Sequence, residues 1–453
     1  MTPPVQPLTA NAQKTPSLRW VLASLSLSML LSSLGTSIAN VGLPALAQVF
    51  GASFQQVQWV VLAYLLAITT LIVSAGRLGD LIGRRRLLLI GIALFTLASV
   101  LCGLAPSLSL LIAARAVQGL GAAIMMALTL AFIGETVPKA KTGSAMGLLG
   151  TMSAIGTALG PSLGGVLIAG LGWQTIFLIN VPLGILTFAL AWLHLPADCR
   201  GPNTVRGDFD PLGTLLLALT LAAYALAMTQ GHGSFAALLL AAVVGGGLFV
   251  FVEAKVASPL IRLGLLRDLA LSGSLASNLL VSTVMMATLV VGPFYLTRGL
   301  GLNLALVGMV MSIGPIISVL SGFPAGRVVD RFGAPMMAVV GLMGMAAGSM
   351  ALALLPALLG VAGYVAGIAV LTPGYQLFQA ANNTLVMVDV PGDQRGMMSG
   401  LLSLSRNLGL ITGASVIGAV FVASGMRITF VVTTVLIVAA LAIALAGRGR
   451  NAN

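Results

Sequence analysis

The sequence predicts an all-α protein that crosses a membrane many times. Hydrophobic residues make up 58% of the 453 residues and charged residues only 7%, whereas about 25% of the residues are charged in an average soluble protein. The apolar residues form continuous runs of the length that a helix needs to span a bilayer. They lack the alternation of apolar and polar residues that is typical of barrel strands. No polar region is long enough to add a soluble domain.

Fourteen apolar runs are long enough to form membrane helices. They lie at about 20–42, 57–76, 87–105, 108–133, 143–170, 174–194, 211–230, 235–253, 270–296, 303–323, 336–355, 357–386, 397–422 and 428–447. An even number of crossings places both ends of the chain on the same side of the membrane.

The basic residues indicate which side this is. Of the 22 Lys and Arg residues, 18 fall on the side of the termini, Arg298 and Arg427 fall on the other side, and Arg115 and Arg406 fall within membrane runs. Since Lys and Arg accumulate in cytoplasmic loops, we expect both termini to be cytoplasmic. The same rule accounts for the formal net charge of +12, so we predict no nucleic-acid partner.

A basic, glycine-rich stretch occurs twice, and we expect each copy to form a short loop between two helices. Residues 76–86 read GRLGDLIGRRR and residues 326–333 read GRVVDRFG, so that Asp330 lies 250 residues after Asp80. At about 30 residues for a crossing with its loop, this distance is about eight crossings rather than six. We therefore expect two six-helix bundles with two further helices inserted between them.

The predicted domains follow from this count. The segment before the inserted helices is a polar linker, and the one after them alternates Leu and Ile with charged residues, as in a helix that lies on the membrane surface. The domains are a cytoplasmic tail (1–17), an N-terminal six-helix bundle (18–195), a cytoplasmic linker (196–210), two inserted transmembrane helices (211–254), an interfacial linker (255–268), a C-terminal six-helix bundle (269–447) and a cytoplasmic tail (448–453).

Four further motifs occur in order along the chain. Residues 36–44 read TSIANVGLP, 111–123 read LIAARAVQGLGAA, 156–165 read GTALGPSLGG and 399–409 read SGLLSLSRNLG. With the repeated glycine-rich stretch, these motifs resemble the major facilitator superfamily, and within it the fourteen-helix drug:proton antiporters. The resemblance covers nearly the whole chain. One position departs from the family's pattern, because Gly35 stands where the family usually has an acidic residue.

The resemblance implies a secondary active transporter in the cytoplasmic membrane of a bacterium. Such a protein exports small organic molecules, drug-like or metabolite, by alternating access in exchange for protons. The repeated stretch then forms a gate on the cytoplasmic side, at Gly76, Arg77, Gly79, Asp80, Gly83, Arg84, Arg85, Gly326, Arg327, Asp330 and Arg331. The other interpretation of Asp80 and Arg84 is a solvated ion pair of little energetic value.

The fifth predicted helix carries the motif that the resemblance assigns to antiporters. Its residues are Gly156, Gly160, Pro161, Gly164 and Gly165, and in the family this segment packs against the other half and prevents leakage. The other interpretation is that these glycines only allow close helix packing.

Polar residues on helix faces are the candidate substrate pathway. Helical spacing predicts the shared faces, and the other interpretation is hydrogen bonding between helices or, for the two arginines, to backbone carbonyls. The candidates are Ser33, Thr36 and Asn40 on the first helix, Arg115, Gln118 and Met125 on the fourth, Tyr375, Gln379, Asn382 and Asn383 on the twelfth, and Arg406 on the thirteenth.

The acidic residues indicate the substrate class. We place all ten of them in loops or at helix ends, whereas an ionisable group deep in the membrane is costly and usually functional. We therefore favour neutral, zwitterionic or anionic substrates over lipophilic cations. The two Cys and two His residues form no ligand cluster, so we predict no metal and no cofactor. The expected partners of a monomer are a small-molecule substrate, protons and the lipid bilayer.

Two alternatives remain open. An uncoupled facilitator, or an anion or metabolite exchanger of the same fold, would need no titratable group deep in the membrane. A receptor or a membrane-bound enzyme is the other, although the sequence has no nucleophile beside a base. We predict that the chain is not an enzyme.

Overall fold

The computed structural model describes residues 18–137, 142–196, 211–229, 235–256, 264, 267–387 and 395–451, and these residues are helical with short turns. The first group of helices is followed along the chain by an added pair and a second group. The first group consists of α1 (Leu18–Val49), α2 (Phe54–Ile82), α3 (Arg84–Gly103), α4 (Leu108–Thr136), α5 (Thr142–Leu171), α6 (Thr175–Leu178) and α7 (Asn180–His194).

The pair and the second group complete the chain. The pair is α8 (Pro211–Thr229) and α9 (Phe235–Glu253), and the second group is α10 (Leu269–Phe294), the π-helix η3 (Tyr295–Gly299), α11 (Leu304–Phe332), α12 (Ala334–Met387), α13 (Arg395–Thr412), the π-helix η4 (Gly413–Ile417) and α14 (Gly418–Asn451). The prediction of an all-α fold is confirmed for the described residues, which include no strand.

The number of crossings is consistent with fourteen, which stays a prediction. Within the described residues, 11 helices are long and apolar enough to cross a membrane, and Pro211–Ala227 is a shorter apolar helix. Two of the long helices contain a break. The backbone of Gly360 in α12 has φ 54° and that of Gly425 in α14 has φ 73°, a region that favours glycine, so each of these helices is two segments.

The two repeated glycine-rich stretches are mostly helical, so the prediction of loops there was wrong. α2 continues through Gly76 to Ile82, and the turn needs only Gly83, whose φ is 104°. Likewise α11 continues to Phe332, and Gly333 turns the chain with φ 85°. A helical glycine costs about 1 kcal/mol relative to alanine, yet one residue with positive φ is enough to reverse the chain.

Several helices begin with a side-chain cap at the end of the molecule that is opposite to the two glycine-rich stretches. Ser53 and Gln56 form a capping box at the start of α2, and Ser107 and Asn303 accept hydrogen bonds from backbone N–H groups in the first turns of α4 and α11. Such caps satisfy N–H groups that have no partner within the helix. They fix the short turns that connect antiparallel helices.

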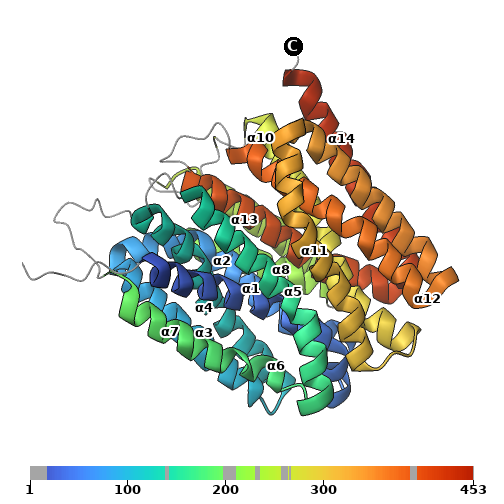
Figure 1. Ribbon diagram of the computed structural model, residues 1–453, viewed down its shortest axis with the longest axis horizontal. Coiled ribbons are helices and arrows are strands. Elements are labelled where there is room, and N and C mark those ends of the chain that lie inside the picture. The colour runs from blue at the N-terminus through green and yellow to red at the C-terminus, as the bar shows by residue number, and fades with distance from the viewer. Residues whose placement is uncertain are drawn as a thin grey trace, which may run out of the picture.

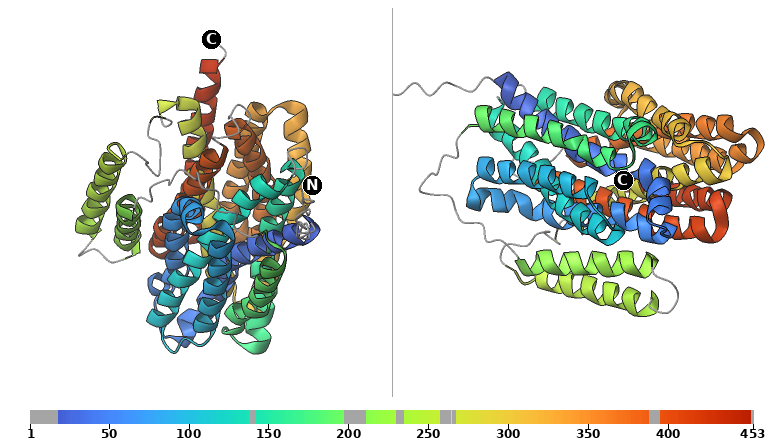
Figure 2. Two further views of the ribbon diagram at one scale, coloured as in Figure 1. Left: turned by 90° about the vertical axis from the view of Figure 1, so that its left-hand side faces the viewer. Right: turned by 90° about the horizontal axis from the view of Figure 1, so that it is seen from below.

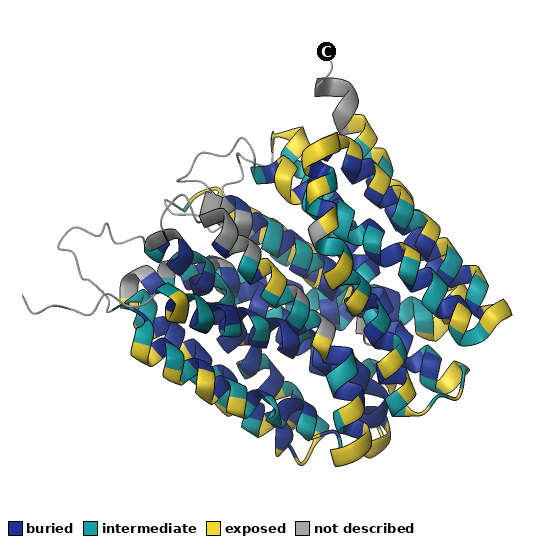
Figure 3. Cartoon of the chain, in the orientation of Figure 1, coloured by how far each residue is buried: buried dark blue, intermediate teal, exposed yellow. Residues whose placement is uncertain are grey.

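The helices form two groups that lie side by side (Figure 1). α1 packs mainly on α5, and α2 and α3 pack on α4. In the second group α10 packs on α13 and α14, and α11 packs on α12. Buried residues face the inside of the molecule and exposed residues cover its outer faces (Figure 3). We call the end where α1 begins and α14 ends the termini end, and the end where α1 passes into α2 the far end.

The pair α8 and α9 lies outside both groups (Figure 2). α8 nevertheless contacts a helix of each group. Ser74 Oγ of α2 and Thr214 Oγ1 are 2.8 Å apart, and Tyr224 Oη donates to Thr412 Oγ1 of α13 at 3.2 Å. The pair is therefore placed along the seam between α2 and α13.

Candidate functional site

Arg115 is enclosed by the helices of the first group. Its Nε donates to the carbonyl oxygen of Val60 on α2 at 2.8 Å, and Nη2 donates to that of Gly35 on α1 at 3.0 Å. Nη1 donates to Gln118 Oε1, and the ring centroid of Tyr64 lies 4.1 Å from Cζ. The side chain is fully buried, and a buried cation needs several such partners.

This geometry matches the interpretation in which Arg115 binds backbone carbonyls. Gln118 is also buried, and its Nε2 donates to Ser99 Oγ of α3 at 2.7 Å. The network thus joins α1, α2, α3 and α4. Met125, further along α4, is buried as well. A direct substrate role for these three residues stays a prediction, since in this conformation the protein itself surrounds them.

Gly35 is required by the packing around Arg115. A Cβ atom at this position would lie 2.9 Å from Tyr64 Oη and 3.2 Å from the ring of Phe95. The Tyr64 hydroxyl donates to the carbonyl oxygen of Ser32 at 2.8 Å. The space beside Gly35 that a side chain would need is therefore occupied by the tyrosine.

The polar face of α1 is largely satisfied by neighbouring groups. Ser33 Oγ lies 2.7 Å from Ser153 Oγ of α5, and Thr36 Oγ1 donates to the carbonyl oxygen of Ser32. Asn40 Nδ2 donates to the carbonyl oxygens of Thr36 and Ser37, but its Oδ1 is buried without a partner. Of the three predicted pathway residues, Ser33 and Asn40 are buried and Thr36 is half-buried.

The polar face of the second part of α12 is less completely satisfied. Gln379 Nε2 donates to Tyr375 Oη at 3.2 Å, and both residues are half-buried. Gln379 Oε1 and Asn382 Nδ2 are buried without partners, as is Nε of Arg406 on α13. Asn383 is exposed. Buried polar groups without partners are rare in proteins, so these atoms mark a region that water or a ligand can satisfy.

The predicted gate residues lie in the last turns of α2 and α11 and at the start of α3. A Cβ atom at Gly79 would lie 2.6 Å from Leu128 Cδ2 of α4, so this glycine lets α4 approach. The side chains of Arg77 and Asp80 lie outside the described part of the molecule. Arg327, Asp330 and Arg331 are exposed, Arg84 and Arg85 are half-buried, and Gly76 and Gly326 have open space beside them.

The predicted antiporter segment packs along α1. A Cβ atom at Gly156 would collide with the carbonyl oxygen of Leu30, one at Gly160 with Ser37, and one at Gly164 would lie 2.6 Å from a methyl group of Val41. These three glycines therefore share one face and let two backbones approach closely.

Gly165 instead contacts the other group of helices. A Cβ atom there would lie 2.5 Å from Cα of Gly308 on α11, and one at Gly308 would lie 3.0 Å from the carbonyl oxygen of Pro161. Both contacts are near the far end, where α5 ends and α11 begins. The segment therefore holds the two groups together at that end.

Residues that sequence reasoning missed complete this closure. Gln58 Nε2 of α2 donates to the carbonyl oxygen of Ala414 in η4 at 2.7 Å. Phe54, at the start of α2, packs against Phe294 of α10 with ring centroids 4.5 Å apart, and against Phe421 of α14 at 5.8 Å. The far end is therefore closed along α2 as well as along α5.

A repeat in the sequence could have identified two residues of this closure. Gln58 precedes Gly308 by the same 250 residues that separate Asp80 from Asp330. The two residues thus occupy corresponding positions on α2 and α11, the helices that end in the repeated glycine-rich stretches.

A family model described as Major Facilitator Superfamily matches residues 25–414, and a second match covers residues 274–451. The chain belongs to the major facilitator superfamily. It is therefore a multi-pass membrane transporter with a small-molecule substrate rather than an enzyme, and its resemblance to exporters of this superfamily is supported by its relatives.

Two relatives and one solved structure illustrate the range of similar proteins. Multidrug resistance protein Stp of Mycobacterium tuberculosis is 32% identical over 410 residues, which are 89% of this chain and 75% of that protein. Riboflavin transporter RibZ of Clostridioides difficile is 30% identical over 407 residues, 90% of this chain and 89% of that protein. The structure of a D-xylose-proton symporter covers 94% of this chain and 97% of its own, with a TM-score of 0.70 and 15% identity, which supports the fold alone.

Proposed function

We propose that this transporter exports small organic molecules from the cytoplasm across the bacterial cytoplasmic membrane by alternating access, in exchange for protons. The observation that carries the proposal is the closure of the far end through Gly165 of the antiporter segment and Gly308. A far end closed by contacts between the two groups is one of the two states that alternating access requires. Multidrug resistance protein Stp, which is similar over 89% of this chain, supports export.

The substrate is neutral, zwitterionic or anionic. Asn40, Gln379 and Asn382 present uncharged amide groups, and one atom of each is buried without a partner. Among the described acidic side chains, Glu253, Asp268 and Asp330 all lie at or near helix ends. Amide groups can donate and accept hydrogen bonds, which suits a polar substrate better than a lipophilic cation. The riboflavin transporter RibZ among the relatives supports a polar substrate of this kind.

Arg115 acts as a scaffold for the first group of helices in this proposal. Its three guanidinium nitrogens all donate to protein acceptors on α1, α2 and α4. The gate at the ends of α2 and α11 faces the cytoplasm, and both termini lie on that side. A thiol-reactive label that cannot cross the membrane tests this placement, because single cysteines at Arg331 and at Gly301 should react from opposite sides.

Reconstituted vesicles test the proposed export. We expect a pH gradient to drive uptake of riboflavin, used as a polar probe, more strongly than uptake of ethidium, used as a lipophilic cation. The matched variants are Gly165→Leu, which should stop transport, and Gly150→Leu on the same helix, which should not, because no atom lies within 4 Å of a Cβ at Gly150. Stronger gradient-driven uptake of ethidium than of riboflavin would contradict the substrate class.

An uncoupled facilitator or exchanger is the second candidate, and Gly35 favours it. The position where the resembling antiporters carry an acidic residue is closed here by Tyr64 and Phe95. The same vesicles separate the candidates. Flux that is equal with and without a pH gradient supports the uncoupled function, whereas flux that rises with the gradient supports exchange for protons.

A further inference from the structure

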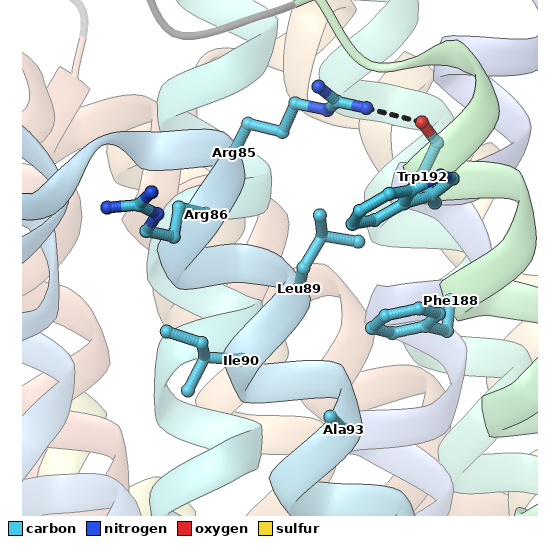
Figure 4. Close-up of a pocket in the computed structure, with 7 residues that line it drawn as sticks. All are labelled: Arg85, Arg86, Leu89, Ile90, Ala93, Phe188 and Trp192. Carbon is cyan, nitrogen blue, oxygen red and sulfur yellow. Dashed lines mark hydrogen bonds between the residues drawn. The ribbon is translucent and has the colours of Figure 1, made fainter.

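A groove runs between α3 and α7 on the outer face of the first group of helices (Figure 4). Its floor and walls are apolar and include Leu89, Ile90 and Ala93 of α3 and Phe188 of α7. Ile90 is 47% exposed, so the groove opens toward the space that lipid occupies around a membrane protein. None of these residues belongs to the transport pathway described above.

Two arginines and a tryptophan lie at the end of the groove that is nearer the termini end. Arg85 extends toward Trp192, while Arg86 extends to the other side of α3 (Figure 4). Arg85 Nη2 donates to the carbonyl oxygen of Trp192, and its Cζ lies 5.6 Å from the centroid of the tryptophan ring. The helical partner of that carbonyl would be the N–H group of residue 196, which is a proline and has none. Arg85 therefore donates the hydrogen bond that the proline cannot donate to this carbonyl oxygen. The bond holds the positively charged guanidinium of Arg85 in the groove.

Aromatic rings indicate the depth of this end in the membrane. Trp192 is 57% exposed, and the ring of Trp20 stacks on that of His194 with centroids 5.4 Å apart. Tryptophan rings gather at the boundary between the lipid headgroups and the hydrocarbon. The arginines are then at the level of the headgroup phosphates, and the apolar part of the groove is at the level of the acyl chains.

We propose that the groove binds one anionic phospholipid. Its phosphate lies against Arg85, since guanidinium groups match the geometry of phosphate oxygens and remain charged, and the exposed Arg86 adds positive charge at the same end of the groove. One acyl chain lies along Leu89, Ala93 and Phe188. Basic pockets between membrane helices on the cytoplasmic side are a recurring way to bind anionic lipid headgroups.

The second group of helices lacks the arginines of this site. The turn at Gly333 corresponds to the turn at Gly83, but the residues that follow it are Ala334, Pro335 and Met336 instead of three arginines. The difference predicts a single tight anionic lipid for each chain. It also provides a control, because Arg331 is exposed near the end of α11 in the second group.

Native mass spectrometry of the purified full-length protein tests the proposal. The protein is titrated with phosphatidylglycerol and phosphatidylcholine of the same acyl composition. We expect one phosphatidylglycerol to bind at least tenfold more tightly than phosphatidylcholine. Arg86→Gln, at an exposed position, should weaken phosphatidylglycerol binding at least fivefold, and Ala93→Leu, which fills the groove, should weaken the binding of both lipids. Arg331→Gln should leave both unchanged.

Three outcomes would overturn the proposal. Equal affinity for the two lipids would mean that the arginines do not select a headgroup. Equal losses in Arg86→Gln and Arg331→Gln would mean that general surface charge attracts the lipid. Displacement of phosphatidylglycerol by soluble glycerol phosphate at a similar concentration would mean that the site takes free phosphate compounds. Because the readout is lipid binding, these results are independent of whether the protein exports its substrate.

Discussion

Two of the contacts that close the far end correspond to each other in the two groups of helices. In the first, Gly165 of α5 meets Gly308 of α11; in the second, Gly418 at the start of α14 meets Gln58 of α2. The first contact is between two backbones. The second uses a side chain, and Gln58 Nε2 also donates to the carbonyl oxygen of Ala414 at 2.7 Å. At corresponding helix positions, α5 and α11 are therefore held by close backbone packing, and α2 and η4 by a hydrogen bond.

The two contacts differ because α11 has Gly308 at the position where α2 has Gln58. Gly308 has no side chain, so α11 approaches α5 until a Cβ at Gly308 would lie 3.0 Å from the carbonyl oxygen of Pro161. Gln58 fills the equivalent space on α2 with its amide. The glycine contact cannot accept any added atom, whereas the contact along α2 consists of one hydrogen bond and the packing of the Phe54 ring on Phe294 and Phe421. We expect the far end to open first along α2 and η4.

We expect the largest effect from a substitution that disrupts the contact between Gly165 and Gly308. Gly165→Leu adds a side chain where a Cβ alone would lie 2.5 Å from Cα of Gly308, so the far end cannot close. We expect the initial transport rate in vesicles to fall at least twentyfold while the thermal unfolding midpoint in detergent stays within a few degrees. A transport rate close to that of wild type would show that α5 and α11 do not need this contact.

The interiors of the two groups have similar glycine contacts but differ in one buried residue. A Cβ at Gly121 would lie 2.7 Å from the carbonyl oxygen of Gly91, and one at Gly374 would lie 2.8 Å from that of Gly341. Arg115 precedes Gly121 by six residues, and the residue that precedes Gly374 by six is Ile368. An apolar residue of the second group therefore stands where the first group has the centre of its polar network.

The second largest effect tests this internal difference. Arg115→Leu removes the donors that serve Gly35, Val60 and Gln118, and each buried acceptor left without a partner costs about 1–3 kcal/mol. We expect the free energy of unfolding to fall by about 3 kcal/mol, measured by thermal unfolding in detergent. Ile368→Val in the second group should cost only about 1 kcal/mol.

The opposite pattern would assign a different role to the arginine. If Arg115→Leu left the unfolding midpoint unchanged but altered which substrates are transported, Arg115 would act in the pathway. Its carbonyl contacts would then belong to one state of the transport cycle only.

A smaller effect tests the glutamine contact. Gln58→Leu keeps much of the side-chain volume but removes the donor to Ala414, and one such hydrogen bond contributes about 1 kcal/mol. We expect the open fraction of the far end to rise about fivefold, measured by the labelling rate of a cysteine at Ser312. An unchanged labelling rate would mean that the hydrogen bond does not hold this side closed.

The smallest effect concerns the added pair of helices. Tyr224→Phe removes the hydrogen bond from α8 to Thr412 of α13, and hydrogen bonds between membrane helices average about 0.6 kcal/mol. We expect the unfolding midpoint to fall by less than about 2 °C and the transport rate to change less than twofold. A larger loss of transport would show that α8 takes part in the motion between the two groups.

Much of the fold could be predicted because it depends on local sequence. Continuous apolar runs predicted the helices, and the repeat of Asp80 at Asp330 predicted a second group of similar design. The ends of helices were less predictable. α2 continues six residues past Gly76, since Gly83 alone makes the turn, and a run of glycines does not reveal which one adopts a positive φ.

The candidate site could be predicted only in part. Helical spacing predicted the polar faces of α1 and α12 as pathway, and the resemblance pointed to the segment that contains Gly165. The partners of these residues depend on helices that are distant in the sequence. Arg115 donates to the backbone carbonyl oxygens of Gly35 and Val60. Every residue has a backbone carbonyl, so the sequence does not show which ones accept these bonds.

Gly35 limits how this protein can change during evolution. A carboxylate acquired at this position would displace Tyr64, whose hydroxyl is bound to Ser32 and whose ring lies beside the guanidinium of Arg115. One codon change would therefore damage the scaffold before it could create a new proton acceptor.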